Sequence, residues 1–280
     1  MERAIIWRSL ISLALVCPAI PGQAGQQVPA NELVRQVIAH ELQAENQDHS
    51  HWMFRLQETQ PATGTRTEEI IETPQGWVRR LLAINGRPLT SRERAKDNQR
   101  IQKLLSDPDE QRKDWQAIRN DVSQAQDLMK MLPDAFLYTY AGRSGDLAKL
   151  NFWPNPKFHP NSRKAAVFHD MVGSLWLNLR KQRLVEINGH LNQEVKFAAG
   201  LLGHLDKGGT FEVKQTEFSP GYWDVTYMNV QMNGKALFFK TIAVREKDIR
   251  SDYQRVPDHL TLAQAANLLK KDTNTLAARR

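Results

Sequence analysis

Three Asn-Gly pairs, each between two apolar stretches, constrain the fold of this chain most strongly. They are Asn85-Gly86, Asn188-Gly189 and Asn233-Gly234. Asn-Gly in this setting is typical of a type I′ turn, in which both central residues adopt positive φ and the turn twists with its strands. Three such turns predict an antiparallel β-sheet.

Other segments carry the same period-two alternation. They are "HWMFRLQ" from His51, "FLYTY" from Phe136, "SLWLNLR" from Ser174 and "YWDVTY" from Tyr222. Alternation of apolar and polar residues indicates strands with one buried face. Together with the hairpins, these segments predict about nine to eleven strands.

A glycine-rich stretch, "GLLGHLDKGGTF" from Gly200, raises the question of a phosphate-binding loop. Such a loop needs a helix whose N-terminal amides face the anion. The residues that follow, "TFEVKQTEF", alternate as in a strand, so no helix is expected there. We therefore interpret Asp206 to Gly209 as a tight turn and predict no nucleotide or other cofactor.

Helices are expected at four places. Asn31 to Glu45 has one apolar face and opens the mature domain. Thr90 and Glu93 form a capping box for a helix to about Leu105, and Pro108 stands at the first position of the next helix. A last helix is expected from Thr261 to about residue 271.

The second of the two central helices has an apolar stripe at spacings of three and four, which predicts that it lies against the sheet. The residues expected to form this cover are Trp115, Ile118, Val122 and Met129. Pro133 is expected to end the helix. The helical insertion thus covers about residues 90–132.

The N-terminus resembles a secretory signal peptide. Arg3 and Arg8 precede a short apolar run, and a small-x-small site ends at Ala24. We expect cleavage there, which leaves residues 25–280 as a single periplasmic domain. Two alternatives are an uncleaved anchor and lipidation of Cys17, the one cysteine of the chain.

The net charge of the whole chain is +7, and its basic residues are scattered rather than gathered in one tract. A mild basic excess in an exported protein favours anionic surfaces such as lipid headgroups over nucleic acid. The expected partners are a lipid or an acylated protein, transient contact with a membrane surface, and a protein of the envelope. Nucleic acid is not expected.

A leading helix, a helical insertion between strands and a meander rich in aromatic residues give the chain the layout of a known superfamily. It resembles the periplasmic lipoprotein carriers, that is, the outer-membrane lipoprotein-sorting (LolA/LolB-like) proteins. The resemblance covers most of residues 31–260 and implies an α+β, mainly β fold. In that fold a curved, incompletely closed antiparallel sheet, a half-barrel, wraps an apolar cavity covered by helices.

No catalytic set is expected from the sequence. His49 and His51 have the spacing of two residues on one face of a strand, which supports a metal-dependent enzyme or hydrolase as an alternative. Zinc needs three or four placed ligands, however, and no further residue has that spacing. The serine in "GRSGD" from Gly142 is interpreted as part of a turn.

Aromatic residues on the expected strands suggest a ligand site. On a curved sheet they can line a concave cavity wide enough for an acyl chain. The candidates are Trp52, Phe54, Trp77, Tyr138, Trp176, Trp223 and Phe238. The alternative for each of them is ordinary core packing. The sequence therefore favours a non-enzymatic carrier or sensor of lipid or lipoprotein acyl chains, with a protein-interaction module of the envelope as a further alternative.

Overall fold

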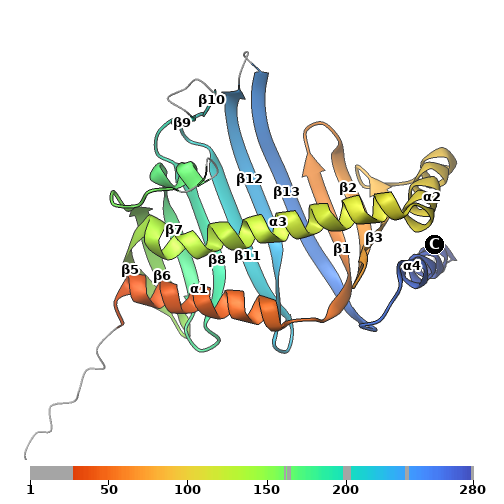
Figure 1. Ribbon diagram of the computed structural model, residues 1–280, viewed down its shortest axis with the longest axis horizontal. Helices are drawn as coiled ribbons and strands as arrows, with labels where there is room; N and C mark the ends of the chain where they lie inside the picture. Colours follow the sequence, from red (N-terminus) through yellow and green to blue (C-terminus); the bar gives the residue numbers. More distant parts are fainter. Residues whose placement is uncertain (1–27, 161, 163–164, 198–202, 237–239, 279–280) are drawn as a thin grey trace, which may run out of the picture.

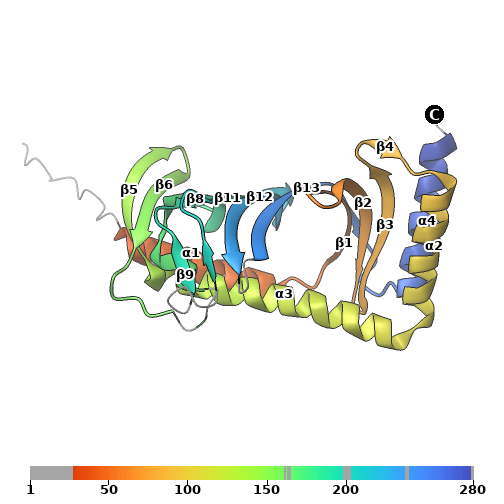
Figure 2. The ribbon, with the colours of Figure 1, turned by 90° about the horizontal axis from the view of Figure 1, so that it is seen from above.

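The protein is mainly an open antiparallel β-sheet with helices on it, as the sequence predicts. The structure, a computed structural model, describes residues 28–160, 162, 165–197, 203–236 and 240–278. Within these residues, thirteen strands form one sheet in the order β4-β3-β2-β1-β13-β12-β11-β8-β7-β6-β5, while β10 pairs with β12 and β9 pairs with β10. Figure 2 shows that the sheet is curved and does not close.

The strands are more numerous than the sequence predicts, because several short ones lack a clear alternation. Their bounds are β1 His51–Gln60, β2 Gly64–Thr73, β3 Gly76–Ile84, β4 Arg87–Pro88, β5 Phe136–Ser144, β6 Leu147–Pro154, β7 Met171–Asn178, β8 Arg183–Leu191, β9 Val195–Phe197, β10 Gly203–Leu205, β11 Thr210–Ser219, β12 Tyr222–Ala236 and β13 Lys240–Val256.

The helices stand where the sequence places them, except that the last helix continues to Ala278, beyond the expected end at about residue 271. They are α1 Ala30–Gln47, α2 Ser91–Ser106, α3 Pro108–Ala135 and α4 Leu262–Ala278, with a short 3₁₀ helix η1 at Ala165–His169. The capping box of Thr90 and Glu93 is formed. The prediction that Pro133 ends α3 is wrong, because Pro133 lies in the last turn and the helix continues to Ala135.

Two of the three Asn-Gly pairs are not turns, which corrects the prediction. Only Asn85-Gly86 has positive φ at both residues, 50° and 75°. Gly189 lies within β8 and Gly234 within β12. A Cβ on Gly189 would stand 2.4 Å from the carbonyl oxygen of Val172, and one on Gly234 would stand 2.1 Å from that of His204. At these two positions glycine allows close approach of a neighbouring strand, which is a non-local requirement.

The expected turns elsewhere are confirmed. Gly208, in the turn before β11, has a φ of 83°. Gly145 follows Ser144 of β5 in the turn to β6 and has a φ of 58°. Neither glycine-rich segment leads into a helix, so each simply joins two strands.

Helices cover the sheet differently at its two ends. Figures 1 and 2 show α1 and the long α3 lying along one face, which we call the concave face, while α2 and α4 stand beyond β3. We call the part with β5–β8, α1 and the C-terminal half of α3 the β5 end. Its core includes Val37, Phe136, Leu150, Leu175 and Leu191.

The part with β1–β3, α2 and α4 is the β3 end, and it has a separate core. Ile71 and Val78 of the sheet pack there with Ile101 of α2 and with Ala265 and Leu269 of α4. In contrast, the described residues of β11 are all at least partly exposed. The sheet is therefore tightly packed at its ends and loosely covered in the middle.

Candidate functional site

A cavity of about 270 Å³ lies between α3 and the concave face of the sheet. Its lining comes from the C-terminal half of α3 and from strands on the β5 side of β13. The lining residues are Ala125, Leu128, Met129, Leu132, Phe136, Phe152, Phe168, Met171, Leu184, Val185, Ile187, Phe211, Val213, Gln215 and Val225. The walls are thus almost entirely apolar, which suits an apolar ligand.

One end of the cavity is closed by a cluster of phenylalanines. The ring centroid of Phe136 is 4.7 Å from that of Phe152 and 5.3 Å from that of Phe168. Phe136 and Phe152 are buried almost completely. Tilted and edge-to-face pairs of this kind pack densely, so this wall is rigid.

The helix α3 is held at both ends but is loosely packed between them. At its C-terminus, the hydroxyl of Tyr138 donates to the Leu132 carbonyl at 2.8 Å. At its N-terminus, the Gln111 amide donates to the carbonyls of Leu104 and Leu105. Among the described residues, the buried ones of α3 are Pro133 and Ala135 only. The apolar stripe of α3 faces the sheet without being buried by it.

Gln215 brings the one polar side chain to the cavity lining, next to a buried ion pair. Glu41 of α1 is 3% exposed and its Oε2 lies 2.8 Å from Nη2 of Arg183. The backbone N–H of Leu184 donates to Glu41 Oε1 at 2.6 Å. Burial raises the pKa of the Glu41 carboxyl, although Arg183 opposes this. The ion pair fastens α1 to β8 beside the cavity.

A single cross-strand row shows how the concave face changes along the sheet. Cross-strand partners share a face, so each pair in register extends the row by one strand. From β5 to β3 its members are Tyr140, Leu150, Leu175, Ile187, Val213, Met228, Asp248, Glu58, Arg66 and Ile84. The row is apolar as far as β12 and charged from β13 to β2. Beside it on the same face of β1 and β2, Phe54, Leu56 and Ile70 form a separate apolar cluster.

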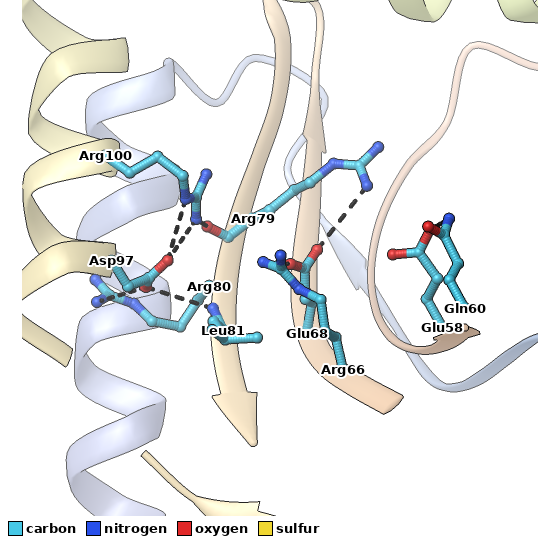
Figure 3. Close-up of polar contacts among 9 residues, drawn as sticks. All are labelled: Glu58, Gln60, Arg66, Glu68, Arg79, Arg80, Leu81, Asp97 and Arg100. Atoms are coloured by element: carbon cyan, nitrogen blue, oxygen red, sulfur yellow. Dashed lines mark hydrogen bonds and ion pairs between the residues drawn. The ribbon is translucent and has the colours of Figure 1, made fainter. Parts of the chain in front are cut away.

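Charged side chains continue over the concave face of β2 and β3. Glu68 is buried, and Figure 3 shows Arg66 and Arg79 pointing toward its carboxylate. The distances to Glu68 are 2.9 Å from Arg66 Nη2 and 3.9 Å from Arg79 Nη1. Burial together with Glu246 and Glu58 raises the pKa of Asp248 to about 6. This part of the face is polar and internally paired.

On the opposite side of β3, another buried carboxylate fixes α2 to the sheet. Asp97 of α2 lies 3.4 Å from Nη1 of Arg80 and 2.7 Å from Nη2 of Arg100. Figure 3 shows these two arginines and Asp97 between the helix and the strand. The Asp97 carboxylate therefore holds α2 against β3. Because α3 begins two residues after α2 ends, this contact also positions the start of α3.

The predicted metal alternative has no support in the geometry. In the described part of the chain, one group of residues is close enough to share an ion, and it consists of Glu58, Glu246 and Asp248. His49 is exposed and precedes β1, and Nδ1 of His51 lies 3.7 Å from Asp258. The two histidines therefore lie outside that acidic group.

The predicted cover residues lie on α3, but only part of the stripe reaches the cavity. Met129 lines it. Trp115 and Ile118 are partly exposed farther toward the N-terminus, and Val122 is 40% exposed. Tyr138 lies in the core of the β5 end, where it packs against Phe136, and does not line the cavity.

The predicted strand aromatics are distributed over three places. Trp52, Phe54 and Trp77 belong to the β3 end, where Phe54 stacks on Tyr253 with ring centroids 5.5 Å apart and meets Trp77 edge-on. Trp223 lies 5.3 Å beneath the guanidinium of Arg183. None of these four rings lines the cavity.

Trp176 lies on the outer face of β7. Its neighbours Leu175 and Leu177 are buried in the core, and alternation directs Trp176 the other way. Lys149 stands 5.5 Å over its ring. Phe238, the remaining candidate, lies outside the described residues.

The sequence-based selection missed the strand residues that line the cavity, which include aliphatic side chains and phenylalanines. Phe211 and Val213 alternate in "TFEVKQTEF", and that alternation was the available signal. The alternation of Phe211 and Val213 predicted a strand with one apolar and one polar face. It did not show which face of the sheet lies beneath α3, so it could not place these two residues in the cavity and Trp176 on the opposite face.

Comparisons with known proteins give structural likenesses only. No known protein family and no curated protein matches the sequence. A domain from Vibrio parahaemolyticus described as an outer membrane lipoprotein-sorting protein is similar over 86% of this chain and 98% of its own, with 11% identity and a TM-score of 0.30. A DUF1329 family protein from Desulfovibrio piger is similar over 86% of this chain and 99% of its own, with 9% identity and a TM-score of 0.31.

The first of these proteins belongs to the class whose layout the sequence resembles. At this level of similarity neither structure indicates a function for this chain. In the described residues, no helix has the length and hydropathy needed to cross a membrane.

Proposed function

We propose that this protein is a non-enzymatic carrier or sensor in the cell envelope, and that it holds an acyl chain of a lipid or lipoprotein between α3 and the sheet. The observation that carries the proposal is the apolar cavity of about 270 Å³ under α3. The signal-like N-terminal sequence supports export to the periplasm.

The physics of the cavity favours a flexible apolar ligand. Each methylene transferred from water contributes about 0.8 kcal/mol, so a chain needs few polar contacts to bind. Sites for drug-sized ligands range from about 300 to 1,000 Å³, and this cavity lies just below that range. We therefore expect it to hold one acyl chain rather than several.

The helix α3 acts as a cover in this proposal. It crosses the concave face, as Figure 1 shows, and contacts α2 and β3 toward its N-terminus and α1 and β5 toward its C-terminus. None of the residues in the middle of α3 is fully buried. Displacing the middle of α3 therefore breaks few contacts and admits a chain to the cavity.

The direct test is to recover the ligand. The full-length gene is expressed in a Gram-negative host, the periplasmic protein is purified without detergent, and organic extracts are examined by mass spectrometry. Metal content is measured on the same sample. Stoichiometric lipid without metal supports the carrier. Stoichiometric zinc overturns it in favour of an enzyme, and finding neither favours a protein-interaction module.

A matched pair of variants locates the lipid. Val213 lines the cavity, whereas its neighbour Lys214 pairs with Glu212 and Glu186 on the outer face. V213D should abolish lipid retention, because it buries a carboxylate in the apolar wall. K214D should retain the lipid. Equal retention by two folded variants would place the ligand elsewhere.

A further inference from the structure

The polar end of the cavity offers a means of selecting among acyl lipids. Gln215 supplies the one polar side chain among the lining residues of the described chain. In the orientation that satisfies its amide, the nitrogen donates to the carbonyl of Leu184 at 2.6 Å and to Oε1 of Glu41 at 3.1 Å. Both N–H groups are then used, and the amide oxygen remains as an acceptor.

The charges beside Gln215 are already paired. Arg183 is 9% exposed and lies between the Glu41 carboxylate and the Trp223 ring, 2.8 Å and 5.3 Å away respectively. A charged ligand group placed beside Gln215 would meet the Glu41–Arg183 ion pair, whose net charge is zero. It would lose its hydration without gaining a free counter-ion, which disfavours binding of a charged group.

One buried donor remains at this site. Nε of Arg183 is buried and has no hydrogen-bond partner. A neutral carbonyl can accept from such a donor, and a hydroxyl or amide N–H can donate to the Gln215 oxygen. Acyl amides with an N–H, and acyl esters of polyols such as glycerol, carry both kinds of group, whereas an ionised fatty acid carries acceptors only.

We propose that Gln215, with the Glu41–Arg183 pair behind it, determines specificity for acyl chains whose polar end is uncharged and includes a hydroxyl or an amide N–H. Free fatty acids are excluded by the same residues. This inference rests on the proposed function, since it assumes that an acyl chain occupies the cavity.

The test compares two ligands of one chain length, 1-dodecanoylglycerol and dodecanoate. Each is titrated calorimetrically, below its micelle concentration and at neutral pH, into delipidated mature protein. The wild type should bind the glycerol ester at least about tenfold more tightly. Equal binding, or tighter binding of dodecanoate, overturns the inference and leaves the proposed function standing. Binding of neither ligand overturns both.

Two variants separate the residues. Q215L removes the acceptor but keeps the volume, so the affinity for the glycerol ester should fall about fivefold or more while that for dodecanoate stays unchanged. E41Q leaves the charge of Arg183 unpaired and should reverse the preference toward dodecanoate. A wild-type preference in folded Q215L overturns the role of Gln215.

The control is K214Q, on the outer face of the same strand, where Lys214 pairs with Glu212 at 2.8 Å. It should bind both ligands like the wild type. Circular dichroism checks the fold of every variant. If E41Q does not fold, Q215L decides the question, because it leaves the ion pair in place.

Discussion

The two ends of the concave face are built from different strands of one sheet, and they use different chemistry. The cross-strand row is apolar at Leu175 and Ile187 near the β5 end and charged at Glu58 and Arg66 near the β3 end. The same helix, α3, crosses both parts in Figure 1. The apolar cavity lies where both the helix and the row are apolar.

The comparison also shows that the two ends are stabilised differently. The β5 end is held by apolar packing of α1 and α3 on the sheet. At the β3 end, buried carboxylates of Glu68 and Asp97 are satisfied by arginines, next to a smaller apolar core. The described cavity lies at the β5 end, where the row is apolar, whereas charged side chains of the row alternate with the Phe54, Leu56 and Ile70 cluster at the β3 end.

The largest effect should come from Asp97→Ala, which breaks the buried network of the β3 end. Arg80, whose side chain is 11% exposed, would lose its partner. Removing one member of a buried pair costs about 3–5 kcal/mol. Chemical denaturation should show this loss, whereas D109A, at a side chain 72% exposed, should cost under about 1 kcal/mol. Similar losses for both would refute the distinction.

The two ends should also respond differently to the same glycine substitution. At the β5 end, Gly189→Ala drives a methyl group into the Val172 carbonyl and the Phe211 ring and should cost about 1–3 kcal/mol. At the β3 end, Gly86 has open space, so Gly86→Ala should cost only the strain of positive φ, about 1 kcal/mol.

Thermal unfolding of G189A and G86A measures the difference. Only G189A should also weaken ligand binding, because its methyl group pushes on the Phe211 ring, which lines the cavity. A larger loss of stability in G86A would contradict the close-packing explanation for Gly189.

The free energy of unfolding should depend on pH through Glu72, a residue of β2 at the β3 end. Burial, assisted by Asp224, raises the pKa of Glu72 from 4.5 to about 7. Between those values the native state keeps a proton that the unfolded state has released, so stability should fall as the pH rises. With partial solvent screening the loss is about 1–2 kcal/mol.

The control for this prediction is E72Q, which cannot titrate. Its unfolding free energy should lose that downward trend between pH 4.5 and 7. A slope equal to that of the wild type would assign the effect to another group, such as Asp248, whose pKa is raised to about 6.

The smallest effect is expected on the outer face of the β5 end. Trp176→Asp removes a cation–π contact with Lys149, worth about 0.5–1 kcal/mol at an exposed site, and does not touch the cavity wall. Lipid retained from the host should remain at the wild-type level. Lipid loss in a folded W176D protein would show that the outer face takes part in binding.

Much of the fold could be predicted from the sequence because its signals are local. The capping box at Thr90 and Glu93 and the proline at position 108 mark helix starts within one turn of chain. Alternation marked strands such as β1 and β11 for the same reason. The prediction of an open antiparallel sheet with helices on it was confirmed on this basis.

The candidate site was less predictable. Met129 was identified from the stripe on α3 and does line the cavity, but the strand residues were chosen for aromatic character. None of the chosen strand aromatics in the described residues lines the cavity, which is lined by Ile187, Val213 and a different aromatic residue, Phe211, together with Gln215. Their importance arises from their position beneath α3.

Hydrophobic period and capping depend on residues a few positions apart, so most of the long strands and helices could be identified from the sequence. The packed sheet was needed to show which face of each strand is concave, and whether an Asn-Gly pair is a turn, as at Gly86, or a close approach, as at Gly189. The physical reason is that a side chain's environment is set by the neighbouring strands and the covering helix. In this sheet those neighbours come from distant parts of the chain, as when Glu58 of β1 pairs with Asp248 of β13.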